Sequence, residues 1–152
     1  FTEKSGINSV IVDSVNDIKA VAQNIAFSVS LYSGQMCTAP QNIFIPEEVK
    51  TADGVLSFDE VTSEIAEAVK GVISHPKMGA GTLGSVQNDA TIKRINIVKG
   101  SILLAPQKVE NPEAANARIQ SPTIITVDAI SEEYKEESFG PLVFLVKTYM
   151  KR

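Results

Sequence analysis

Short apolar runs rich in β-branched residues alternate with helical patterns along this chain, and that alternation restricts the folds open to it. The strand-like runs occupy residues 10–12, 42–45, 101–105, 123–127 and 142–146, and those at 10–12 and 101–105 predict buried strands. Apolar residues recur at three- and four-residue spacing over residues 17–32, 57–74 and 89–99. Strands that alternate with helices predict an α/β fold, with a largely parallel sheet flanked by helices in a three-layer αβα arrangement. The length of 152 residues fits one domain.

Capping signals mark where two of these helices begin. Asn16 or Asp17 can cap the first helix, and Ser57 followed by Glu60 has the spacing of a capping box at the second. The second helix should end before Pro76. The first helix should end in a turn that contains residues 34–37.

That turn contains the only cysteine of the chain, Cys37. Gly34 allows a sharp turn ahead of it, and Pro40 prevents a helix from continuing through it. A thiol at such a junction could be reached by a ligand. The alternative is a buried structural residue, since free cysteine is among the most buried residue types.

Two acidic motifs lie at a distance from the thiol. Glu3 opens a Glu-Lys-Ser-Gly segment 34 residues upstream, and Glu137 opens Glu-Ser-Phe-Gly-Pro 100 residues downstream. A glutamate near a chain end is usually an exposed, loosely held side chain. The acids over residues 132–137 could equally form a solvated helix face, with Phe139 as its anchor in the core.

Taken together, these three motifs resemble the aldehyde dehydrogenase superfamily. Residues 33–46, which include Gly-Gln-Met-Cys-Thr-Ala, are similar to its nucleophile loop and look most like the phenylacetate-degradation branch of the PaaN type. The motifs follow the family order, and the resemblance spans nearly the whole chain. It implies that Cys37 is the nucleophile, that Glu3 is the base for deacylation, and that Glu137 and Phe139 contact the cofactor. One departure is Lys4-Ser5-Gly6, where the family has Leu-Gly-Gly.

The resemblance also implies a reaction. A thiolate attacks an aldehyde to give a thiohemiacetal, hydride passes to NAD or NADP, and water hydrolyses the remaining thioester to a carboxylic acid. The oxyanion would be held by the backbone N–H of Cys37 and by an asparagine outside this chain. Two alternatives stay open: a coenzyme-A-acylating aldehyde dehydrogenase, and a non-catalytic interaction domain of the same fold.

Family members are much longer than this chain. We therefore expect residues 1–152 to be a truncated catalytic (C-terminal) domain without the nucleotide-binding domain, which would bind most of the cofactor. On this expectation the isolated fragment is inactive and the full-length protein forms a homo-oligomer. The expected partner is a small-molecule aldehyde, with a coenzyme-A-linked semialdehyde as one option.

Composition excludes several other functions. The net charge of −4, without a basic cluster, argues against nucleic acid as a partner, and no apolar run is long enough to span a bilayer. One cysteine cannot form an internal disulfide, which favours the cytoplasm, and a lone histidine far from it excludes a zinc site. Residues 79–84 spell Gly-x-Gly-x-x-Gly, but without a preceding strand or a later acid we expect a mobile surface loop.

Overall fold

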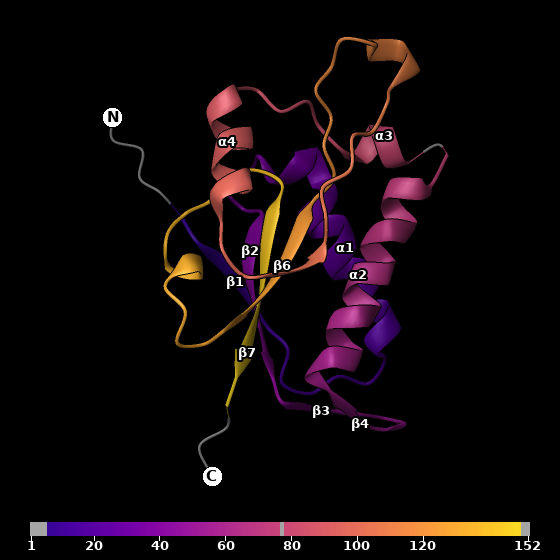
Figure 1. Cartoon of the computed structure of the whole chain (residues 1–152). Helices are drawn as coiled ribbons and strands as arrows, with labels where there is room; N and C mark the ends of the chain where they lie inside the picture. The colour runs from indigo at the N-terminus through magenta and orange to yellow at the C-terminus, as the bar shows by residue number, and fades with distance from the viewer. Residues whose placement is uncertain (1–5, 77, 150–152) are drawn as a thin grey trace.

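The computed structural model describes residues 6–76 and 78–149, and its centre is a five-stranded sheet (Figure 1). The strand order is β1-β2-β7-β6-β5. The bounds are β1 Asn8–Ile11, β2 Pro40–Pro46, β5 Ser101–Leu104, β6 Thr123–Asp128 and β7 Leu142–Thr148. Strands β1, β2, β7 and β6 are parallel, whereas β5 pairs with β6 antiparallel. The predicted largely parallel sheet is therefore confirmed.

Two long helices cover one face of this sheet. They are α1 (Ile18–Ser30) and α2 (Phe58–Ser74), which pack against each other and against the sheet. Apart from Phe58, their contribution to the core is aliphatic and includes Ile25, Val29, Val61 and Ile65. Burial of this stripe, at roughly 25 cal/mol per Å² of apolar surface, is the main force that holds the two helices on the sheet.

The opposite face carries a thinner layer. Helix α4 (Asp89–Ile97) contributes Ile95, and a segment around the short 3-10 helix η3 (Glu133–Lys135) contributes Tyr134. The Tyr134 ring meets Phe44 edge to face, with ring centroids 5.7 Å apart. Helical segments thus flank the sheet on both sides, as the α/β prediction required.

The ends of α1 follow from local chemistry. Asp17 caps its start, because the carboxylate accepts hydrogen bonds from the backbone N–H groups of Lys19 (2.9 Å) and Ala20 (3.1 Å). The helix ends at Ser30, earlier than the predicted 32. Tyr32 and Ser33 adopt left-handed backbone angles in the following 3-10 turn η1 (Leu31–Gly34), which an α-helix cannot include.

The predicted burial was wrong for residues 101–105 and for most of 10–12, where Ile11 is 77% exposed and only Val12 is buried. Strand β5 lies at the edge of the sheet and exposes three of its four residues, including Ile102 at 60%. An apolar run alone does not distinguish a central strand from an edge strand, because that depends on which elements cover it.

Two further segments differ from the predictions. Residues 48–56, which lie between the predicted strand at 42–45 and the predicted helix at 57–74 and were assigned to neither, form with Ser57 the hairpin β3 (Glu48–Thr51) and β4 (Gly54–Ser57). The predicted surface loop at residues 79–84 begins with a one-turn helix, α3 (Gly79–Thr82), whose Gly79 is buried against α2. A Cβ there would lie 2.3 Å from the carbonyl oxygen of Ile73, so close packing accounts for this glycine. The remaining 3-10 turn is η2 (Pro112–Ala114).

Across the described residues, no helix is both long enough and apolar enough to cross a bilayer.

The capping box of α2 gives a first prediction. Ser57 Oγ accepts from the Glu60 N–H (3.3 Å), and the Glu60 carboxylate accepts from the Ser57 N–H (2.8 Å) and hydroxyl (2.7 Å). Ser57→Ala should lower the free energy of unfolding by about 1 kcal/mol in urea melts at pH 7. Ser63→Ala, an exposed change inside the same helix, should leave it unchanged or slightly higher.

The same box has a pH dependence. Hydrogen bonds from Ser57, its backbone N–H first and its hydroxyl second, hold the pKa of Glu60 below the ordinary 4.5. A lowered folded-state pKa contributes stability above pH 4.5 that is lost as the pH falls further. Because Ser57→Ala keeps the backbone N–H and removes only the hydroxyl, the stability gap between wild type and Ser57→Ala should narrow below pH 4.5 by the share of the hydroxyl bond, and a constant gap would contradict that bond.

Candidate active site

The thiol of Cys37 is exposed, in a turn between η1 and β2. The turn is held by a hydrogen bond from the Asn8 side-chain amide to the Cys37 carbonyl and by one from the Ala39 N–H to the Met36 carbonyl (3.0 Å). The alternative of a buried structural cysteine is therefore wrong, and the sulfur is open to a reactant.

An unusual backbone conformation leads into this turn. Tyr32, Ser33 and Gly34 have φ values of 51°, 55° and 65°, so three consecutive residues are left-handed. For residues with a side chain this conformation costs roughly 1–2 kcal/mol each. The fully buried Ser33 offsets part of that cost, because its Oγ lies 2.8 Å from the Gly84 carbonyl and accepts from the Gly84 N–H at 3.2 Å.

The thiol turn and the Glu-Ser-Phe-Gly-Pro segment are in direct backbone contact. A Cβ added to Gly34 would lie 2.4 Å from the carbonyl oxygen of Gly140. Gly140 itself has a φ of 133°, and a Cβ there would lie 2.4 Å from Cγ2 of Thr91. Only glycine fits both positions, and the contact brings together motifs 100 residues apart.

Glu137 and Phe139 face a small hollow at this contact. Both residues line it, together with Gly34 and Met36 from the thiol turn and Gly6 from the upstream motif. The Glu137 carboxylate is half-buried and accepts a hydrogen bond from the Gly6 N–H at 3.1 Å. The structure therefore brings the described end of the upstream motif, the thiol turn and the downstream motif to one place.

The alternative of an acidic helix face at residues 132–137 is wrong. Only Glu133–Lys135 form a single 3-10 turn, and Glu136 and Glu137 are outside it. Phe139 is 38% exposed, which does not fit an anchor in the core.

Glu3, the other predicted catalytic residue, lies outside the described residues. Its assignment stays a prediction.

Two polar residues that sequence reasoning did not connect with the site hold the Glu137 segment. Gln41 Oε1 accepts from the Ser138 N–H (2.6 Å) and its Nε2 donates to the Glu136 carbonyl (2.9 Å). Asn42 Nδ2 donates to the Tyr134 carbonyl (2.8 Å), which gives a structural reason for asparagine there. The available signal was two adjacent polar residues in a strand that is otherwise apolar, since buried polar groups need partners.

Strand order explains why the three motifs meet. Each motif directly precedes a strand, and those strands, β1, β2 and β7, are neighbours in the parallel part of the sheet. Segments that precede adjacent parallel strands emerge at the same edge of the sheet. In the described part of the chain, no three His, Cys, Asp or Glu side chains are grouped as metal ligands would be.

The fold and site define an α/β domain in which an exposed cysteine lies in a turn that contacts, through Gly34, the loop of Glu137 and the exposed Phe139. The model of the aldehyde dehydrogenase family matches residues 1–150. The chain belongs to the aldehyde dehydrogenase family.

Individual relatives agree with this assignment. The chain is 28% identical over 146 residues to the N-succinylglutamate 5-semialdehyde dehydrogenase of Pseudomonas fluorescens (strain Pf0-1), covering 95% of this chain and 29% of that protein. It is 30% identical over 149 residues to the enzyme of the same name from Ectopseudomonas mendocina (strain ymp), with the same coverage. The chain thus spans less than a third of these relatives.

Solved structures share the fold. The NAD-dependent aldehyde dehydrogenase of Burkholderia multivorans is similar with a TM-score of 0.91 and 43% identity, over 96% of this chain and 27% of that one. The NAD-dependent benzaldehyde dehydrogenase of Corynebacterium glutamicum has a TM-score of 0.66 and 25% identity, over 95% and 30% of the two chains.

The contact between Gly34 and Gly140 gives a second prediction. Gly34→Ala should lower the free energy of unfolding by about 2–4 kcal/mol, from the left-handed φ and the overlap with a backbone oxygen. Gly71→Ala is the matched control, since that exposed position in α2 has open space and should gain about 0.5–1 kcal/mol. Equal unfolding midpoints for the two variants would show that the backbone contact does not form.

Proposed function

We propose that this chain is the catalytic-domain part of an NAD(P)-dependent aldehyde dehydrogenase that oxidises an aldehyde to a carboxylic acid. The observation that carries the proposal is the exposed Cys37 turn, packed through Gly34 on the Gly140 carbonyl beside Glu137 and Phe139. This arrangement supports covalent chemistry at the sulfur and cofactor contacts next to it.

Cys37 acts as the nucleophile. Its thiolate adds to the aldehyde carbonyl, and the resulting thiohemiacetal carries an oxyanion that the Cys37 backbone N–H can stabilise. When hydride leaves that carbon, the sulfur retains the acyl group as a thioester. The cofactor supplies one function, an electrophilic nicotinamide ring that accepts the hydride.

Glu137 and Phe139 fit a nicotinamide cofactor by their chemistry. A carboxylate with one oxygen engaged by the Gly6 N–H keeps lone pairs free to accept from the two hydroxyls of a ribose. The exposed Phe139 ring offers an apolar surface for a flat heterocycle. These residues would hold one end of NAD or NADP, and most of the binding surface would come from a nucleotide-binding domain.

Glu3 completes the cycle as the base that activates water for hydrolysis of the thioester. Gly6, three residues further on, donates to Glu137 in the same hollow, which supports this role. Hydrolysis distinguishes the proposal from a coenzyme-A-acylating reaction, in which a thiol takes the acyl group.

The substrate is proposed at the level of class. The curated relatives act on a semialdehyde by their names, and one structural relative on benzaldehyde, so an aldehyde is the common chemistry. The amino-acid sequence of residues 33–46 resembles the PaaN type and favours an aldehyde of phenylacetate degradation, with a coenzyme-A-linked semialdehyde as one form. Assembly of the full-length protein into a homo-oligomer is part of the same proposal.

The nucleophile assignment predicts the result of one substitution. In the protein expressed from its full coding sequence, Cys37→Ala should lower aldehyde-dependent reduction of the nicotinamide by about 10³-fold or more. The measurement is absorbance of the reduced cofactor, and Gln23→Ala, an exposed change on α1, is the control. Wild-type turnover by Cys37→Ala would refute the proposal.

The base assignment predicts a different signature. Glu3→Gln should still acylate Cys37, giving a burst of reduced cofactor of about one per site, followed by a steady rate about 10²-fold or more below wild type. Mass spectrometry should show the acyl group on the Cys37 peptide. Glu3→Gln with a normal steady rate would contradict this role, and acyl-coenzyme A as the main product of the wild type would favour the acylating reaction.

A further inference from the structure

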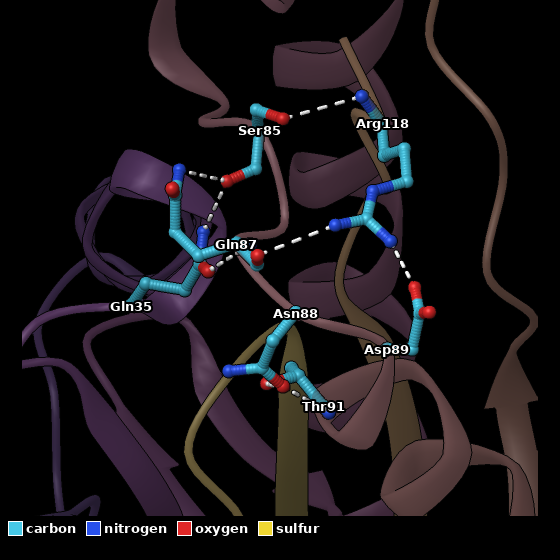
Figure 2. Close-up of polar contacts among 7 residues, drawn as sticks. All are labelled: Gln35, Ser85, Gln87, Asn88, Asp89, Thr91 and Arg118. Atoms are coloured by element: carbon cyan, nitrogen blue, oxygen red, sulfur yellow. Dashed lines mark hydrogen bonds and ion pairs between the residues drawn. The ribbon is translucent and has the colours of Figure 1, made fainter.

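Gln35 lies two residues before Cys37, and its side chain uses both ends of its amide. Nε2 donates to the carbonyls of Ser85 (2.9 Å) and Tyr32 (3.1 Å), and Oε1 accepts from the Gln87 N–H (3.0 Å). Figure 2 shows this amide against the segment of residues 85–87. These three bonds require a side chain that ends in both a hydrogen-bond donor and an acceptor. A carboxylate or an aliphatic side chain does not provide both.

The segment that receives Gln35 is itself fixed from its other side. Arg118 donates from its backbone N–H to Ser85 Oγ (3.2 Å) and from Nη2 to the Gln87 carbonyl (3.2 Å), and it also pairs with Asp89 (Figure 2). The Val86 N–H donates to the Arg118 carbonyl at 2.8 Å, and the Val86 side chain is 1% exposed. Gln35 therefore binds a segment, residues 85–87, that is itself held in place by Arg118; we call this segment and its continuation to residue 94 the support.

This support continues into the Glu-Ser-Phe-Gly-Pro segment. Asn88 caps α4, with its Oδ1 accepting from the Thr91 N–H at 2.9 Å. Thr91 is 2% exposed, and its methyl group occupies the space that a Cβ on Gly140 would need. Arg94, on the same helix, donates to the Phe139 carbonyl at 3.4 Å. Residues 85–94 thus contact the thiol turn at one end and residues 139–140 at the other.

We propose that Gln35 is a positioning residue, which sets the place of Cys37 relative to Glu137 and Phe139 through the support of residues 85–94. The inference rests on the proposed function of Cys37. The left-handed backbone of residues 32–34 costs free energy. The turn therefore keeps this conformation only because contacts with the rest of the protein stabilise it. Gln35 supplies three of these contacts at the point where the chain leaves that segment.

The test compares Gln35→Ala and Gln35→Met in the protein expressed from its full coding sequence. Methionine has a similar length and flexibility but makes none of the three amide hydrogen bonds. Both variants should lower kcat for aldehyde oxidation by about 10- to 100-fold, with KM for the aldehyde within about threefold of wild type, since misplacement of a reacting group by about 1 Å has effects of this size. Gln23→Ala, which removes an exposed amide on α1, should retain the wild-type kcat.

A second measurement separates positioning from loss of folded protein. The rate of Cys37 alkylation by iodoacetamide, followed from pH 6 to 10 and expressed per folded molecule, should show an altered pH profile in both Gln35 variants. A wild-type profile with wild-type kcat in Gln35→Met would overturn the inference, as would a loss of kcat that matches the loss of folded protein. If Cys37→Ala is inactive in the same assays, such a result removes only the role of Gln35. An active Cys37→Ala would remove the proposed function itself.

Discussion

The backbone approach of Gly34 to the Gly140 carbonyl is the constraint on which the site depends. It needs a Gly34 without a Cβ, and it joins loops that precede neighbouring strands; Gly140 lacks a Cβ for a separate close contact, with the methyl group of Thr91. With a side chain at Gly34, the Cys37 turn and the Glu137 segment would have to separate. The hollow at this contact is lined by residues of both loops.

Sheet topology then determines which loops can take part. Strands β1, β2 and β7 are adjacent and parallel, so the segments before them share one edge, although they lie far apart in the sequence. Strand β6 continues the parallel set, and the carbonyl of Gln120, just before it, lies 3.0 Å from Ser33 Oγ. In open α/β sheets, ligands commonly bind at the carboxyl ends of the strands. Here the candidate residues gather at the amino ends, because the motifs precede their strands.

The sequence predicted those parts of the fold that local physics decides. Asp17 at the start of α1 and the Ser57–Glu60 box at α2 satisfy helix N–H groups within a few residues, so they can be recognised without tertiary information. The central strands were visible as apolar β-branched runs. The exposure of β5 was not predictable, since it depends on which elements cover an edge.

Some residues of the candidate site were also recognisable from the sequence, because their chemistry and spacing are local features. Cys37, Glu137 and Phe139 carry recognisable chemistry and fixed spacing, which the sequence displays directly. Gln35, Gln41 and Asn42 bind main-chain groups 50 to 97 positions away. Any residue type can provide such a group, so the sequence does not reveal the hydrogen bond. Only a folded chain shows which carbonyl lies opposite an amide side chain.

Main-chain partners place few demands on the side chains of the segments that provide them. A hydrogen bond to a carbonyl or an N–H depends on the path of the partner segment and leaves its side chain free to change. Ser33, Gln35, Gln41 and Asn42 all bind main-chain groups. Gly34 and Gly140 are different, because the requirement there is space: a Cβ at either position would lie 2.4 Å from an atom of another segment.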